Sequence, residues 1–133
     1  MSYESIRQSV ISSIKAPFEA AFPGVAVVYD NAPFNFDSPP DFYVEFEVKF
    51  YGGQQIGMSA APRTRVSGFV YVTATARRGT GVKRVQQALD WFASNLEYKS
   101  FGGVLLQAAE PDGDGGNQAW YTESVKVGFY KDP

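Results

Sequence analysis

The clearest pattern in the chain is an alternation of apolar and polar positions from Asp41 to Tyr51. Successive side chains of a strand face opposite sides of a sheet. One face of this segment therefore carries only apolar residues, namely Phe42, Val44, Phe46, Val48 and Phe50. The other face carries Tyr43, Glu45, Glu47, Lys49 and Tyr51. The pattern predicts a long, half-buried strand whose apolar face is covered by helices.

A second alternation runs from Arg65 to Arg77, with small apolar residues on one side and polar or aromatic residues on the other. The two long segments are expected to pair as an antiparallel hairpin. Between them, Gly52 to Arg63 has no hydrophobic period and is rich in Gly, Gln, Ser and Ala. It predicts a link longer than most hairpin loops, of the kind that is often functional.

Two segments have the spacing of amphipathic helices. The first is expected from Ser2 to about Phe22, with the stripe Ile6, Val10, Ile14, Phe18 and Phe22. Pro17 predicts a kink or a break near Lys15–Ala16. The second is expected from Val82 to Leu96, with Thr80 as its cap and the stripe Val82, Val85, Leu89, Phe92 and Leu96.

Three further strands are expected at Val25–Tyr29, Phe101–Gln107 and Trp120–Tyr130, with a hydrophilic turn over Asp112–Asn117. Strands bracketed by helices indicate an α+β fold. We predict a single domain over residues 1–133. Its sheet is antiparallel or mixed, has about four to five strands, and carries two helices packed on one face.

The amino-acid composition argues against several classes of function. The 133 residues include no cysteine and no histidine, so disulfides and the most common general base are absent. A formal net charge of -2 gives no overall attraction to nucleic acid or to an anionic membrane. We expect a protein that is not an enzyme, with no cofactor and no metal, and with neither membrane association nor specific nucleic acid binding.

The sharpest charge feature is a basic turn around Gly79-Thr80-Gly81, formed by Arg77, Arg78, Lys83 and Arg84. A helix N-terminus already carries partial positive charge, so added cations are mildly unfavourable there, and the arrangement makes sense if an anionic group such as a phosphate docks. The turn does not have the Walker pattern of a nucleotide-binding loop, which argues against a nucleotide phosphate as the ligand. The alternatives are an acidic neighbouring subunit or an ordinary solvated turn.

Four aromatic residues fall on the face opposite the predicted core: Tyr43, Tyr51, Phe69 and Tyr71. A monomer rarely leaves such a patch bare, so self-association is one interpretation and cross-strand pairing is the other. The candidate interface residues are Arg63, Arg65, Arg77, Arg78, Lys83, Arg84, Tyr43, Tyr51, Phe69 and Tyr71.

Two acidic patterns resemble ligand or catalytic sites, but neither matches fully. Asp112, Asp114 and Glu123 match three positions of a calcium loop, but Gly116 and Asn117 replace required residues and the next segment is a strand. Glu45 and Glu47 share a strand face next to Lys49, where solvation or a salt bridge is the simplest interpretation.

The segment Tyr29-Asp30-Asn31-Ala32-Pro33-Phe34 resembles a motif of the bacteriophage tail-terminator-like family of tail completion and minor tail proteins. The matching residues are Tyr29, Asp30, Asn31, Pro33 and Phe34, with Asp30 where glutamate is usual. The resemblance extends over most of the chain through the order of its features. These are Phe22-Pro23-Gly24, Pro39-Pro40, the glycine-rich link, Gly79-Thr80-Gly81 and Trp120-Tyr121.

The resemblance implies a structural virion protein that forms a homo-oligomeric, hexameric ring on the tail tube of a long-tailed phage. There it would end tube polymerisation and form the joint to the head connector. Its partners would be itself, the tail tube protein and the head–tail connector protein. Its location would be the tail or neck of the virion, after assembly in the host bacterial cytoplasm. The alternatives are a head-closure or head–tail joining protein, or a small-ligand-binding α+β domain.

Overall fold

The computed structural model describes residues 3–29, 36–56 and 63–132, and gives only the backbone at residues 53–56, 63 and 114. Its two helices are α1 (Tyr3–Ala21) and α2 (Lys83–Leu96). Its strands are β1 (Ala26–Tyr29), β2 (Phe42–Ile56), β3 (Arg63–Arg77), β4 (Ser100–Phe101), β5 (Val104–Gly116) and β6 (Trp120–Lys131). Neither helix has the length and apolar character that a bilayer-crossing helix needs.

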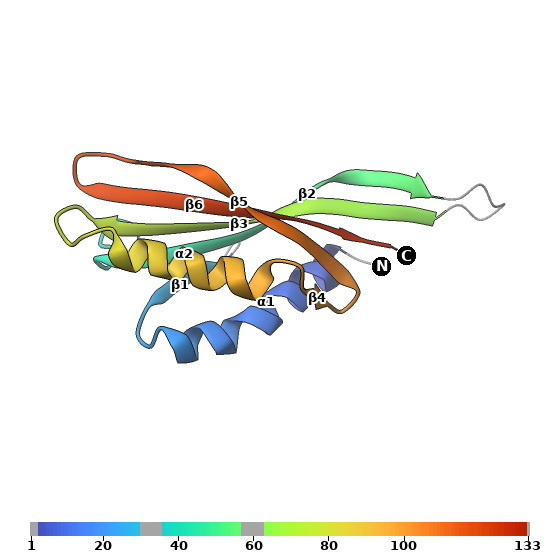
Figure 1. Cartoon of the computed structure of the whole chain (residues 1–133), viewed down its shortest axis with the longest axis horizontal. Helices are drawn as coiled ribbons and strands as arrows, with labels where there is room; N and C mark the ends of the chain where they lie inside the picture. The colour runs from blue at the N-terminus through green and yellow to red at the C-terminus, as the bar shows by residue number, and fades with distance from the viewer. Residues whose placement is uncertain (1–2, 30–35, 57–62, 133) are drawn as a thin grey trace.

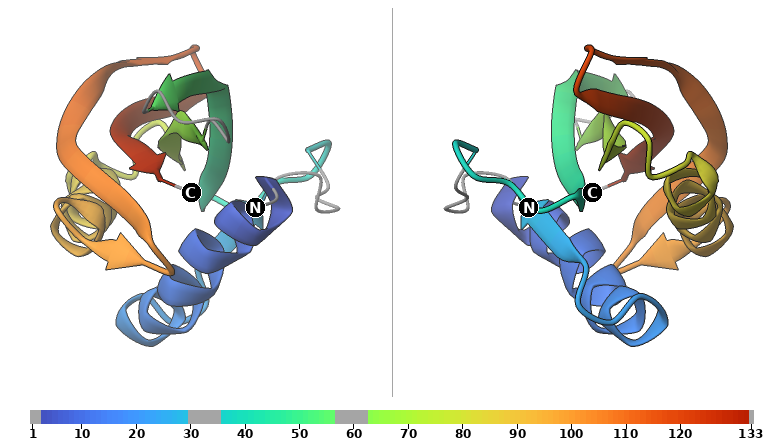
Figure 2. Two further views of the ribbon diagram at one scale, coloured as in Figure 1. Left: turned by 90° about the vertical axis from the view of Figure 1, so that its right-hand side faces the viewer. Right: turned by 90° about the vertical axis from the view of Figure 1, so that its left-hand side faces the viewer.

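The strands form one mixed sheet in the order β1-β2-β3-β6-β5-β4, in which only β1 and β2 are parallel. The α+β class and the mixed sheet are confirmed. The expected four to five strands are too few, because the described residues form six. The sheet is strongly twisted and curls towards a half-barrel (Figure 2). Both helices lie on the same side of it (Figure 1).

The core lies between the helices and the apolar face of the sheet. Val44 and Phe46 of β2 and Val70 and Val72 of β3 are fully buried, as the alternation predicts. From the helices, Phe18 of α1 and Phe92 of α2 meet with their ring centroids 4.7 Å apart. The ring of Phe92 also lies 5.9 Å from that of Phe46. The two helices and the central strands therefore share one aromatic contact.

Helix α1 is continuous through Pro17, so the expected break near Lys15–Ala16 is wrong. Proline removes one helical hydrogen bond and crowds the preceding turn. Ile14 and Phe18, on either side of it, are both buried against the sheet. Burial of the stripe holds the helix together across the proline.

The described part of the expected Gly52–Arg63 link continues the two long strands. Strand β2 runs on to Ile56 and pairs with β3 from Arg63 onwards, after a register shift at Phe50/Gly52. Strand β6 ends its pairing with β3 at Val66, so the last residues of the hairpin form a two-stranded arm. The arm projects beyond the helices (Figure 1). Residues 57–62 of the expected link lie outside the described residues.

Strand β5 is longer than expected, because it includes Pro111 and most of the predicted Asp112–Asn117 turn. Its pairing with β6 shifts register twice, once between Leu106 and Ala109 and once between Pro111 and Asp114. Such irregularities and an edge proline discourage pairing with another strand. On the opposite side of the sheet, β1 pairs only with Tyr43 to Phe46 of β2.

Gly68 provides a test of this packing, because β2 and β6 both crowd it. A Cβ atom there would lie 2.7 Å from Cζ of Phe129 and would collide with the carbonyl oxygen of Lys49. We expect Gly68→Ala to lower the free energy of unfolding by about 1–3 kcal/mol, as overpacking does. Gly115→Ala is the matched control, since its Cβ would meet nothing within 4 Å. Its effect should stay within about 0.5 kcal/mol. Equal urea midpoints for the two variants would contradict this account.

Candidate interaction surfaces

The face of the sheet that the helices leave uncovered is polar in its middle. Thr73 of β3 lies opposite Ser124 of β6, with their hydroxyl oxygens 2.9 Å apart. Thr75 and Thr122 form a second such pair, at 3.3 Å. These pairs satisfy each other across the strands, and Thr75 among them is buried.

Three of the four predicted aromatic residues gather on this face beside the arm, and we call them the aromatic patch: Tyr51, Phe69 and Tyr71. The ring centroids of Tyr51 and Phe69 are 4.7 Å apart, and those of Phe69 and Tyr71 are 5.9 Å apart. The tyrosine hydroxyls share a hydrogen bond of 3.1 Å. Tyr51 nevertheless keeps 61% of its surface exposed.

Lysines border the aromatic patch. Nζ of Lys49 lies 5.3 Å from the centre of the Tyr71 ring, and Nζ of Lys126 lies 5.2 Å from that of Phe69. Cations over ring faces are attracted by the π electrons and cover part of the apolar surface. The aromatic patch is therefore a partly shielded surface. Its rings pair across the strands, only Tyr51 of the three is exposed, and self-association stays a prediction.

Tyr43 does not belong to the aromatic patch, so its expected exposure is wrong. Only 8% of its surface is exposed. Its ring lies 6.1 Å from that of Trp120 and 6.5 Å from that of Phe36, and the guanidinium of Arg77 lies 4.6 Å from the centre of the Trp120 ring. Aromatic neighbours from outside β2 bury a residue that the alternation places on the open face.

The carboxylates of Glu45 and Glu47 lie on the same face as the aromatic patch. Glu47 pairs with Lys49 at 3.6 Å, which confirms the salt bridge expected for this pair of acids. Burial and then the charge of Glu47 raise the pKa of Glu45 above its ordinary value. The ion pair with Lys49 therefore offsets the charge of Glu47 but not that of Glu45.

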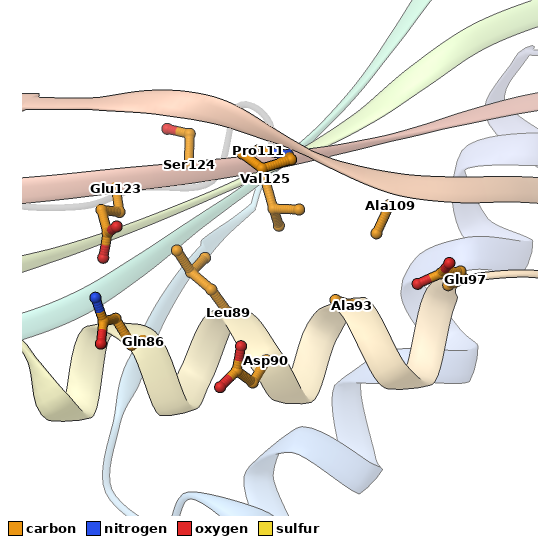
Figure 3. A pocket seen from close by; sticks show the side chains of 10 residues that line it. All are labelled: Gln86, Leu89, Asp90, Ala93, Glu97, Ala109, Pro111, Glu123, Ser124 and Val125. Carbon is orange, nitrogen blue, oxygen red and sulfur yellow. The ribbon is translucent and has the colours of Figure 1, made fainter.

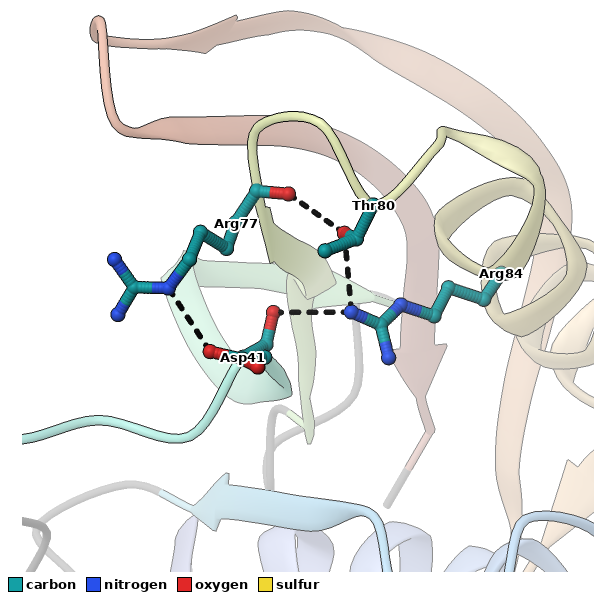
Figure 4. Close-up of polar contacts among 4 residues, drawn as sticks. All are labelled: Asp41, Arg77, Thr80 and Arg84. Carbon is teal, nitrogen blue, oxygen red and sulfur yellow. Dashed lines mark hydrogen bonds and ion pairs between the residues drawn. The ribbon is translucent and has the colours of Figure 1, made fainter.

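In the basic turn, Asp41, Arg77, Thr80 and Arg84 form a hydrogen-bonded cluster, which we call the clasp (Figure 4). These bonds occupy Arg77 and Arg84, so the turn is not an open anion-binding site. Nε of Arg77 donates to Oδ1 of Asp41 at 2.9 Å. The hydroxyl of Thr80 donates to the carbonyl oxygen of Arg77 at 2.6 Å. Nη2 of Arg84 donates to the Thr80 hydroxyl at 3.1 Å and to the carbonyl oxygen of Asp41 at 3.4 Å. Arg77 and Arg84 therefore join the ends of β2 and β3 to the start of α2.

The expected capping role of Thr80 is wrong. The residue at the N-cap is Val82, which makes no side-chain capping hydrogen bond. Thr80 sits two residues earlier, where its hydroxyl bonds to Arg77. The first turn of α2 contains no acidic residue, so within the described chain no side chain offsets the positive end of the helix.

Arg78 and Lys83 remain at the surface of the turn. Nε of Arg78 donates to the backbone oxygen of Asn117, and its guanidinium lies 5.9 Å from the centre of the Tyr121 ring. Both Arg78 and Lys83 are exposed. Among the described residues neither has a carboxylate partner.

The remaining predicted site residues are scattered. Arg65 forms a two-point pair with Asp132, at 2.6 and 3.1 Å, and lies 4.6 Å from the centre of the Tyr130 ring. The side chain of Arg63 and the family-motif residues Asp30, Asn31, Pro33 and Phe34 lie outside the described residues. Tyr29 ends β1 and packs on Phe46 at 6.0 Å.

Sequence reasoning missed an acidic groove of about 400 Å³ between α2 and strands β5 and β6 (Figure 3). Its acidic side chains are Asp90, Glu97 and Glu123, and its lining includes no lysine or arginine. Glu123 comes from the core-facing side of β6 and points towards Gln86 of α2. One signal was available, since Glu123 interrupts the apolar series Tyr121, Val125, Val127 and Phe129.

The groove does not have the ligands of a metal centre. In the part of the chain that the structure describes, no group of three or more acidic side chains is close enough together to hold an ion. Oε2 of Glu123 is shielded from solvent and has no hydrogen-bond partner there. A donor group supplied from outside would satisfy it.

Comparisons with known proteins establish the fold class. No family model matches the chain, and no curated protein matches it. Solved structures do match. One whose name states no activity superposes with a TM-score of 0.74 at 17% identity, over 98% of this chain and 95% of its own. At that identity the likeness shows a shared α+β fold and nothing about activity.

The aromatic patch predicts an unusual titration. The hydrogen bond with Tyr71, followed by burial, raises the pKa of Tyr51 to about 12. Because the folded-state pKa lies above the ordinary 10.0, the stability that this phenol contributes is present below pH 10 and lost as the pH rises towards 12. We expect Tyr71→Phe to move the Tyr51 titration towards 10, measured by tyrosinate absorbance. An unchanged titration would contradict the shared hydrogen bond.

The clasp predicts opposite effects at neighbouring residues. Arg84→Glu removes the donors to Thr80 and Asp41 and should lower the free energy of unfolding by about 1–3 kcal/mol. Lys83→Glu changes the same charge at an exposed site in the first turn. It should leave stability unchanged or raise it by about 0.3–1 kcal/mol. Denaturant melts of the two variants check this, and an equal loss in both would show that charge alone matters.

Proposed function

We propose that this protein is a structural tail terminator, which assembles as a hexameric ring on the tail tube of a long-tailed phage. The proposal rests on two kinds of support. One is the resemblance carried by the Tyr29-Asp30-Asn31-Ala32-Pro33-Phe34 segment and the order of the other features. The other is the presence of two surfaces that favour contact with protein, the aromatic patch and the projecting arm.

The observation that carries the proposal is the continuity between the aromatic patch and the projecting arm. Tyr51 of the aromatic patch directly precedes Gly52, where the register of β2 shifts and the arm begins. Along the arm, backbone groups of β2 and β3 bond only to each other within the described residues. An exposed tyrosine with half-buried aromatic neighbours, beside free strand edges, favours binding to another protein chain.

In this proposal the mechanism is steric and interfacial. A ring seated on the last layer of tube subunits would occupy the surface to which the next layer binds, so growth would stop. The aromatic patch and the arm would supply contacts on the tube or on adjacent subunits. The far side of the ring would then be presented to the connector of the head.

Ring formation and tube capping give the test. Light scattering over a wide concentration range, with and without purified tail tube protein from the same genome, should show a mass several times the 14.6 kDa of one chain. In electron micrographs, tube protein polymerised with substoichiometric amounts of this protein should give shorter tubes with a ring at one end.

A double variant, Tyr51→Ser with Phe69→Ser, should reduce the capping of tubes. Ser67→Ala, on the same face of β3, is the matched control and should cap normally. Unchanged tube lengths with the wild-type protein would remove the terminator role. Binding instead to purified connector protein alone would favour a head-closure or head–tail joining protein.

A further inference from the structure

The charges of α2 are arranged in the direction that adds to the helix dipole. Lys83 and Arg84 stand in its first turn, which has no acidic residue. Its last turn has no basic residue, and Glu97 is its C-cap. A helix on its own is stabilised by the reverse arrangement, with acids at the N-terminus and cations at the C-terminus. The charges of α2 are therefore better suited to a partner than to the helix itself.

The acidic groove beside α2 has carboxylates without counter-charges. Asp90, Glu97 and Glu123 line it, and none of the three forms an ion pair with another described residue. Glu123 also has a carboxylate oxygen that is buried without a hydrogen-bond donor from the described chain. Leu89 and Val125 give the groove an apolar floor (Figure 3). A long cationic side chain suits this surface, because its methylene groups can cover the floor while its charge meets the carboxylates.

The same chain presents such side chains at the start of α2. We call Arg78 and Lys83 the basic end. Both are exposed and neither pairs with a carboxylate of the described residues. Arg77 and Arg84 are held in the clasp with Asp41 and Thr80 (Figure 4), which gives the basic end a rigid support. A rigid charged surface loses little conformational entropy when it binds.

We propose that the basic end of one copy docks into the acidic groove of a second copy. This inference rests on the proposed ring and names the contact that would join its subunits. The two surfaces are of opposite charge, and each lacks a counter-charge within its own described chain. The occupant that they fit best is therefore each other, in a second copy.

The contact is heterologous, because the two surfaces are different parts of the molecule. A heterologous contact repeats from copy to copy and gives either a closed ring or an open filament. The basic end precedes α2, and the groove runs beside the helix from Gln86 to Glu97.

Charge reversal tests the contact. The basic-end variant is Arg78→Glu with Lys83→Glu, and the groove variant is Asp90→Lys with Glu97→Lys. Each variant alone should associate at least ten-fold more weakly than the wild type in light scattering at low ionic strength. Mixing the two variants should restore the wild-type mass, because every contact in the mixture again joins opposite charges. Lys15→Glu with Glu19→Lys, on exposed positions of α1, is the matched control and should associate like the wild type.

Folding is monitored separately. Circular dichroism of each variant should match the wild type. The basic-end variant should melt slightly lower, because Arg78→Glu removes the hydrogen bond to Asn117, while Lys83→Glu favours the helix N-terminus and offsets part of that loss. Rings that persist in both variants would overturn the contact. So would a failure of the folded variants to reassociate on mixing, or a wild-type protein that stays monomeric at every concentration.

The outcome is separable from the proposed function. If the wild-type protein caps tubes but both variants still form rings, the head-to-tail contact is wrong and the terminator role stands. If charge reversal and mixing behave as expected but no ring binds tube ends, the contact stands and the terminator role fails.

Discussion

The contact among Phe18, Phe46 and Phe92 is the interaction on which the rest of the structure depends. It joins both helices to the centre of the sheet, and all three side chains are almost completely buried. Dense packing of large rings is sensitive to changes of even one methylene group. Because the helices are fixed against this single side, the other face of the sheet, its edges and the ends of α2 remain available. The position of the core thus decides where the surfaces for other molecules lie.

Those surfaces differ in character. The aromatic patch is partly shielded by its own lysines, whereas the charged side chains of the basic end and of the acidic groove form no ion pair with another described residue. The two edges of the sheet differ as well. Strand β5 carries two register shifts and Pro111, while most of β2 beyond Phe46 has no neighbour on the side of β1 among the described residues. The domain therefore presents surfaces of different character on different sides.

The sequence predicted the elements whose pattern is regular. Alternation identified the buried faces of β2, β3 and β6, and helical spacing identified α1 and α2. It could not show that β1 runs parallel to β2, because strand direction leaves no mark on local pattern. The strand that it predicted at Phe101–Gln107 ends well before β5 does, since bulges and Pro111 break the alternation that defines a strand. At the sites, Tyr43 was misassigned because its partner Trp120 comes from a distant strand. Thr80 was misassigned because its hydroxyl closes a local turn with the carbonyl oxygen of Arg77 and α2 begins later, after Val82. The groove was missed because β5 and α2 lie close only in the fold.

Strand β6 is the last element of the described chain, yet it lies between β3 and β5 in the middle of the sheet. Its pairing with β3 joins residues about fifty positions apart, such as Thr73 and Ser124. Distant pairings of this kind close slowly during folding. On a translating ribosome, α1, β2, β3 and α2 would emerge before the strand that completes their sheet. Glu123 of β6 also lines the acidic groove, so the groove is complete only after the sheet has closed. Any binding that uses the acidic groove would thus have to wait until the fold is finished.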